Sequence, residues 1–214
     1  RTDVCVDVLN SYLRALRSIS NPIRWKQIGT EMRGLGKNLD SVILRFNRLD
    51  WVDLELPQGV AKLSGKYAGY LSENYMKNRQ TVAVREFVTE GDTLVAVCVD
   101  ALVQLLRKQE VQELIDNEET GLKNNFLAYL QRVEALGQLP PVDHDRRYMT
   151  LLEDLEKAQK IRDKCVSGLQ SLKRAHHKLL TQLDKRERWD YWYEELTELN
   201  TLAVQLNALQ KSLK

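Results

Sequence analysis

The chain has 214 residues, of which 43% are hydrophobic and 29% charged, with only 10 glycines and 4 prolines. This composition suits a folded domain with a hydrophobic core and excludes disordered, collagen-like and low-complexity chains. The 32 basic and 30 acidic residues give a net charge of +2, which is too balanced to indicate a nucleic-acid partner from charge alone.

The first quarter of the chain carries helical patterns separated by turn signals. Residues 3–19 place apolar side chains at three- and four-residue steps, which predicts an amphipathic helix. The pattern stops at 20–22, where a proline pushes the preceding residue out of the helical region. A second helix is expected over 23–50, followed by a turn at 56–59.

The middle of the chain contains its most apolar run, residues 94–106. Alternating valines at the start of this run fit a strand, but its length and its continuation favour a helix buried on all sides. A joint or kink is expected at 90–92 and a helix break at 116–121, where glycine follows acidic residues.

The last third of the chain predicts a long helix. After a joint at 137–143, which holds a pair of prolines, residues 145–213 contain no proline and one glycine, Gly168. The end of this segment carries a nearly heptad-spaced apolar seam, made of Trp189, Trp192, Leu196, Leu199, Leu202, Leu206, Leu209 and Leu213. A bend near Gly168 or at 184–188 is the alternative to one continuous helix.

These patterns together predict an all-α fold, an elongated antiparallel helical bundle of four or five main helices with a long C-terminal helix. We expect one bundle domain over residues 1–214. Its expected joints are 20–22, 56–59, 116–121 and 137–143. No run approaches 18 apolar residues, so we expect no transmembrane helix.

The three cysteines, Cys5, Cys98 and Cys165, lie far apart in the sequence and lack zinc-ligand spacing. Cys98 and Cys165 fall on apolar positions and are predicted to be small buried hydrophobes. Asp3 and Asp7 flank Cys5 and predict a raised thiol pKa. Unpaired cysteines favour a reducing, cytoplasmic location, but the chain does not begin with Met, so a processed exported protein stays an alternative.

Charge is unevenly distributed along the chain. Residues 157–188 carry ten basic against three acidic side chains, whereas residues 86–119 carry nine acidic against two basic ones. The first interpretation is that these helices lie near one another and their charges offset. The second is a basic face for an acidic partner or anionic lipid. The basic window has no aromatic residues for stacking on bases, so nucleic acid is not expected as a partner.

Motifs for catalysis and for cofactor binding are absent from the sequence. The histidines, His144, His176 and His177, lack the spacing of metal sites, and we expect one of the adjacent pair to be partly buried and the other solvated. No glycine-rich phosphate loop or nucleophile elbow occurs. We therefore expect no enzyme activity, no cofactor and no metal.

The leading functional prediction is a non-enzymatic helical interaction or scaffold protein that binds a protein partner or itself through helix faces. The candidate partner-binding residues are Tyr191, Tyr193, Leu199, Leu206, Lys173, Arg174 and Lys178.

The alternative is a membrane-active helical protein, peripheral through the basic face at 157–188 or pore-forming through the apolar segment 94–106. It is disfavoured because thirteen helical residues span only about 20 Å of the roughly 30 Å hydrocarbon core, and because Asp100 lies in the segment.

Overall fold

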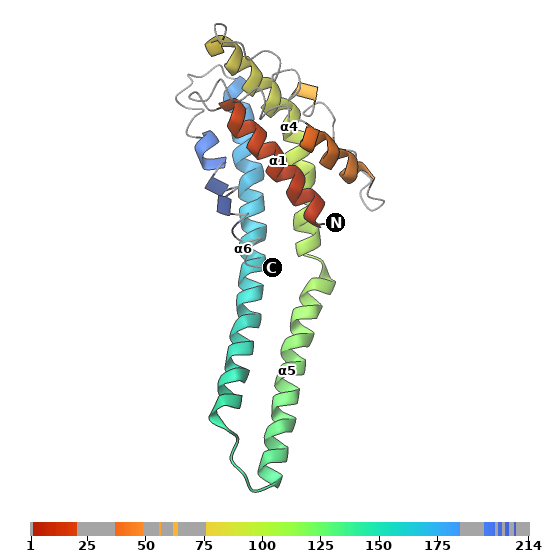
Figure 1. Cartoon of the computed structure of the whole chain (residues 1–214), viewed down its shortest axis with the longest axis vertical. Coiled ribbons are helices and arrows are strands. Elements are labelled where there is room, and N and C mark those ends of the chain that lie inside the picture. Colours follow the sequence, from red (N-terminus) through yellow and green to blue (C-terminus); the bar gives the residue numbers. More distant parts are fainter. Residues whose placement is uncertain are drawn as a thin grey trace. The chain divides into compact units, whose positions relative to one another are not determined.

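A computed structural model describes residues 2–20, 37–48, 56, 62–63, 76–184, 195–199, 201–202, 204–205 and 208. Over these residues the fold is all-α, as predicted, and contains no strand. The main described helices are α1 (Thr2–Ser20), a helix over 37–47, α4 (Met76–Leu106), α5 (Gln109–Ala135) and α6 (Val142–Asp184) (Figure 1).

The chain divides into two compact units, which we describe separately. The core unit comprises residues 1–103 and 168–214, and the hairpin unit comprises residues 104–167. The organisation as a single bundle domain stays a prediction.

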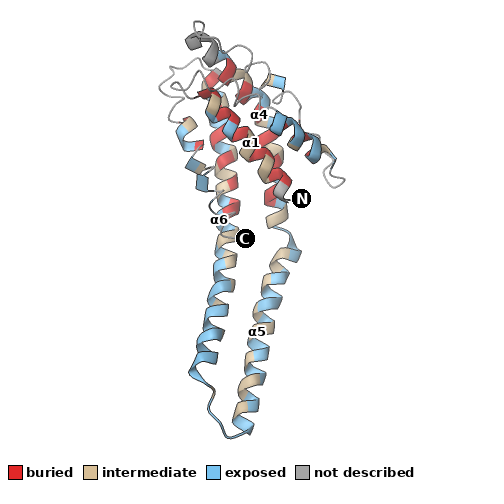
Figure 2. Cartoon of the chain, viewed as in Figure 1, coloured by how far each residue is buried: buried red, intermediate tan, exposed pale blue. Residues whose placement is uncertain are grey.

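The buried side chains of the core unit come from helices that are distant in sequence (Figure 2). The apolar stripe predicted for α1 is buried over its whole length, namely Val4, Val8, Leu9, Tyr12, Leu13, Leu16 and Ile19. The helix over 37–47 adds Leu39, Ile43 and Phe46, and α6 adds Leu172, Leu179 and Leu183, all without exposed surface. Burial of a side chain of this size stabilises the fold by about 1.5–3 kcal/mol relative to exposure.

The apolar segment 94–106 is helical and forms the end of α4, so the helical interpretation is confirmed and the strand is wrong. Leu94, Cys98 and Val99 have no exposed surface. The expectation of burial on all sides is wrong for two positions, because Asp100 and Gln104 are exposed. The Asp100 carboxylate pairs with a lysine. One face of this segment therefore reaches solvent.

The joint expected at 90–92 is wrong, because α4 continues through it without interruption. Gly91 is buried, and a Cβ at this position would overlap the ring of Tyr12 on α1. The glycine therefore permits a close helix–helix approach.

The break expected at 116–121 is also wrong, because these residues lie inside α5. Glutamates are good helix formers, and a single glycine costs only about 1 kcal/mol. Side-chain pairs four residues apart support this stretch, with Gln112 donating to Asp116 and Lys123 pairing with Glu119. The interruption lies instead between α4 and α5, where Lys108 has extended backbone angles.

The turn between α5 and α6 lies at 136–141 and overlaps the joint predicted at 137–143. Gly137 has a φ of +65°, and its N–H donates to the Glu134 carbonyl over 2.8 Å. The Gln138 N–H donates to the Val133 carbonyl over 3.1 Å. This pair of bonds is the Schellman motif that ends many helices at a glycine.

α6 is the longest described helix, with 43 residues, and it passes through Gly168 without a break. The predicted long helix extended to 213, but residues 185–194 lie outside the described part of the chain. Residues 195–199 are again helical.

Candidate functional site

A buried polar network lies in the core unit, where three helices meet. Tyr12 of α1 lies with its hydroxyl 2.7 Å from Nε2 of His176 on α6. The other ring nitrogen of His176, Nδ1, lies 3.0 Å from a carboxylate oxygen of Asp92 on α4. His177 approaches the second oxygen of Asp92 at 3.4 Å. Tyr12 and His176 have no exposed surface, which makes this the most deeply buried polar cluster of the described residues.

The partners fix the protons of this network. A carboxylate only accepts hydrogen bonds, so Nδ1 of His176 carries a hydrogen and donates it to Asp92. In the neutral imidazole, Nε2 then accepts from the Tyr12 hydroxyl, which also lies 3.5 Å from the Phe87 carbonyl oxygen. The hydrogen bond from His176 holds the pKa of Asp92 below its ordinary value, although burial opposes this effect. Burial raises the pKa of Tyr12 well above its ordinary value, and the Asp92 charge adds to that effect.

The network joins α1, α4 and α6 by directional bonds inside an apolar core. The Tyr12 ring also stacks on Phe87 with centroids 5.1 Å apart. A fully satisfied buried network rigidifies a core and selects one packing arrangement. Sequence reasoning predicted one buried and one solvated histidine, and the structure confirms it: His176 is buried and His177 is exposed. The partners Tyr12 and Asp92 were missed, because no local motif links three helices.

The predicted basic contact residues of α6 lie on the core unit and have partners there. The Lys173 ammonium lies 2.6 Å from Asp100 on α4, and that of Lys178 lies 2.6 Å from Glu195. Arg174 is exposed and donates to the Ser171 hydroxyl over 3.0 Å. The Lys173–Asp100 pair joins the basic and acidic windows of the sequence, which supports the interpretation that their charges offset within the fold.

Of the four apolar and aromatic residues predicted to bind a partner, the structure describes only one, Leu199. Leu199 is only 1% exposed, so its side chain packs inside the core unit. Tyr191, Tyr193 and Leu206 lie outside the described residues. The structure therefore brings none of these four onto a described surface.

The hairpin unit consists largely of α5 and the first part of α6, which lie side by side (Figure 1). Phe126 of α5 stacks on Tyr148 of α6 with ring centroids 3.9 Å apart. The Tyr129 hydroxyl and Nδ1 of His144 are hydrogen-bonded over 2.6 Å. Sequence reasoning missed this aromatic cluster, because its members come from both sides of the turn.

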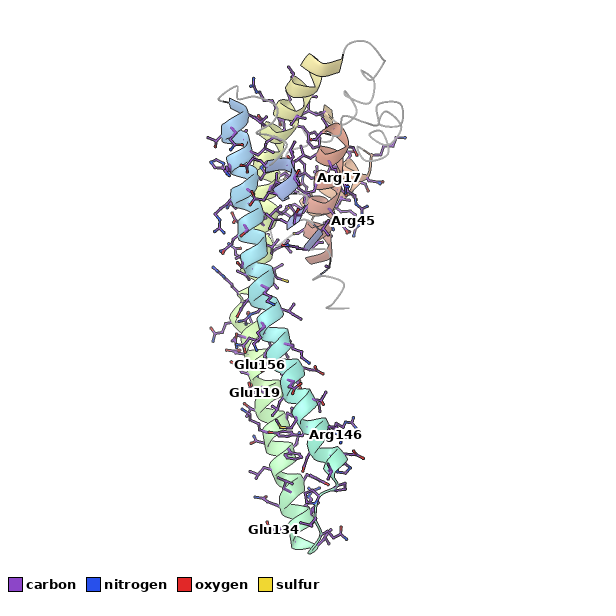
Figure 3. All side chains as sticks on the ribbon, turned by 90° about the vertical axis from the view of Figure 1, so that its left-hand side faces the viewer. Arg17, Arg45, Glu119, Glu134, Arg146 and Glu156 are labelled. Carbon is purple, nitrogen blue, oxygen red and sulfur yellow. The ribbon has the colours of Figure 1, made fainter. Side chains whose placement is uncertain are left out.

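Charged side chains of the hairpin unit pair within their own helix, in a unit that the structure describes throughout. Glu119 pairs with Lys123 on α5, whereas Glu156 pairs with Lys160 on α6. Figure 3 labels Glu119 and Glu134 on α5 and Glu156 and Arg146 on α6. Pairs within one helix do not join it to the other. The contacts between α5 and α6 are the aromatic cluster and the hydrogen bond that Arg162 of α6 donates to Gln112 of α5.

The hairpin unit exposes large apolar side chains on both helices and on the turn. The most exposed is Leu139 in the turn, at 91%. Figure 2 shows that α5 carries intermediate and exposed residues, in contrast to the buried faces of α1 and α4. The exposed apolar residues of the unit are Leu114, Leu127, Leu136, Leu139, Val142, Met149 and Leu151.

Within the described residues, no group of three or more side chains with metal-ligating atoms gathers in one place. None of the described helices combines the length and the apolar character needed to cross a bilayer.

The chain was also compared with known proteins. It matches no protein-family model, no curated protein sequence and no solved structure.

Proposed function

We propose that the chain is a non-enzymatic helical interaction protein, which binds a protein partner or a second copy of itself through the helix faces of the hairpin unit. One observation carries the proposal. α5 has 27 residues, none of them buried, and its Leu114 and Leu127 side chains are 62% and 56% exposed. Large exposed apolar side chains are typical of contact surfaces.

The architecture of the unit supports the same proposal. Two paired helices bury only the stripe between them, whereas four helices enclose a core. Leu114 and Leu127 are 13 residues apart, which places them about 140° apart around α5, so partner contacts on two sides of this helix would be needed to cover both. The core unit offers fewer of the predicted contact residues for binding, since Lys173 and Lys178 have partners within it and Leu199 is buried.

Sedimentation velocity of the full chain, from low to high micromolar concentration, tests self-association. The test variant combines Leu114→Glu and Leu127→Glu, and the control is Val82→Glu, an exposed position on α4 of the core unit. We expect the parent chain to form dimers. The test variant should raise the dimer dissociation constant at least about tenfold, or roughly 1.4 kcal/mol, and the control should leave it unchanged. A chain that is monomeric at every concentration contradicts binding to itself.

Thermal unfolding of the same variants tests whether Leu114 and Leu127 are exposed in the monomer. If Leu114 and Leu127 are free for a partner, charged replacements leave the Tm and helix content of the monomer unchanged. A lower Tm would mean that these leucines stabilise the hairpin from within, which would remove the basis of the proposal.

The alternative is a membrane-active protein, and one observation favours it. Leu136, Leu139 and Val142 are 70%, 91% and 70% exposed around the turn of the hairpin, where apolar side chains could enter the interfacial region of a bilayer. The segment 94–106 contributes less support, because most of its side chains are buried in the core unit.

Co-sedimentation with anionic and neutral liposomes separates the membrane routes. Binding that high salt abolishes would indicate the basic face at 157–188. Salt-resistant binding lost in Leu139→Asp would indicate the turn, whereas salt-resistant binding retained in that variant would indicate 94–106. Absence of binding under all conditions contradicts the alternative.

A further inference from the structure

Two cysteine side chains that are 93 positions apart in the sequence meet inside the core unit. Cys5 lies on α1 and Cys98 on α4, and both are fully buried free thiols. Each of these two thiols shifts the pKa of the other, so the two side chains lie within interaction distance. The third cysteine, Cys165, belongs to the hairpin unit.

The register of α1 against α4 supports this contact independently. The Tyr12 ring packs against Gly91 and stacks on Phe87. Cys5 lies seven residues before Tyr12, and Cys98 lies seven residues after Gly91. α1 and α4 run in opposite directions, with the start of α1 beside the later part of α4 (Figure 1). Seven residues are close to two helical turns, so helices in contact at Tyr12 and Gly91 bring Cys5 and Cys98 to the same level.

We propose that Cys5 and Cys98 are a redox-active pair, which a peroxide oxidises to a disulfide that locks α1 onto α4 and which a dithiol reduces again. The pair is a modification site of the core unit and is separate from the hairpin surface proposed above for binding.

The reaction proceeds in two balanced steps. The Cys5 thiolate attacks one peroxide oxygen, the O–O bond breaks, and the products are a sulfenic acid and hydroxide. Cys98 sulfur then attacks the Cys5 sulfur, and the S–S bond forms as the S–O bond breaks. The departing hydroxide takes the Cys98 proton and leaves as water. Sulfur loses two electrons in total and the peroxide gains them.

The pKa directions of the two thiols fit these two roles. The neighbouring Cys98 side chain lowers the pKa of Cys5, which favours its thiolate. This result corrects the expectation that Asp3 and Asp7 would raise the pKa. The neighbouring Cys5 side chain and burial raise the pKa of Cys98 well above its ordinary value, so Cys98 keeps its proton until the second step.

Burial of both sulfurs governs how the oxidant reaches them. Cys5 is the fourth residue of α1 and lies in its first turn, and helix ends open locally at low free-energy cost. We therefore expect oxidation to be limited by opening of α1. Once formed, the disulfide closes a long loop and raises the Tm by on the order of 10 °C.

The experiment treats the folded full chain with hydrogen peroxide, blocks free thiols with an alkylating reagent and maps the products by mass spectrometry. We expect a Cys5–Cys98 disulfide, alkylation of Cys165 alone, a raised Tm, and reversal of all three changes by dithiothreitol. Cys165→Ser is the matched control and should form the same disulfide. Cys98→Ala, checked for helix content, should lose both the disulfide and the Tm shift.

Three results would overturn the proposal. The first is equal alkylation of all three thiols before and after peroxide. The second is a disulfide that involves Cys165. The third is a Cys5–Cys98 disulfide that forms only in denaturant, because a pair aligned by the fold reacts faster when folded.

Discussion

The ring of Tyr12 on α1 lies directly against the backbone of Gly91 on α4. The hydroxyl of the same ring is hydrogen-bonded to His176 on α6. The close approach of two helices and the polar network of the core unit therefore depend on one side chain. Any change that displaces Tyr12 disturbs both.

Gly91→Ala tests the close approach. The added methyl group would overlap a buried ring that is stacked and hydrogen-bonded, so the ring has little room to move. We expect a loss of about 1–3 kcal/mol in the free energy of unfolding, measured with urea. The matched control is Gly121→Ala, also inside a helix but facing open space. The control should gain about 0.5–1 kcal/mol, and similar losses in both variants would contradict the packing argument.

Tyr12→Phe tests the buried hydrogen bond. The substitution keeps the stacking on Phe87 and leaves Nε2 of His176 without its partner in an apolar core. We expect a cost of about 1–3 kcal/mol from the unsatisfied nitrogen. The comparison is Tyr129→Phe, whose hydroxyl is bonded to His144 at an exposed site where water can replace it. An equal loss of stability in both variants would contradict the expectation that the buried hydrogen bond stabilises the fold more than the exposed one does.

The lowered pKa of Asp92 predicts how stability depends on pH. A group whose pKa is lower in the folded state contributes stability above its unfolded pKa, and that contribution is lost as the pH falls through the folded value. Asp92→Asn removes the contribution. The variant should be less stable than the parent at neutral pH, and the difference should shrink as the pH falls below the ordinary pKa of an aspartate. Urea unfolding at several pH values measures this difference, and a constant difference would contradict the assignment.

Leu199→Lys tests whether the leucine seam packs within the chain or between two chains. Leu199 is buried in the core unit, so the charged replacement should lower the free energy of unfolding by about 2–5 kcal/mol. Val204→Lys changes an exposed position nearby in the sequence and should cost almost nothing. Dissociation of a dimer by Leu199→Lys, with unchanged monomer stability, would instead indicate an intermolecular seam.

Helix type and buried faces could be predicted from the sequence wherever the pattern is local. The stripe of α1 and the burial of Cys98 and Cys165 follow from apolar spacing and are confirmed. Glycine was less informative: Gly91 and Gly121 lie inside helices, whereas Gly137 ends one. A glycine breaks a helix only if its neighbours do not compensate, and at Gly91 the compensation comes from another helix.

The sequence by itself determined that this chain is helical and which face of α1 is buried, because helical periodicity depends on residues within a few turns of one another. Only the tertiary structure decided that Cys5 meets Cys98, that Tyr12, His176 and Asp92 form one network, and that Leu199 is enclosed. The physical reason is that these contacts join separate helices. The spacing of residues along one helix carries no information on which other helix lies against it.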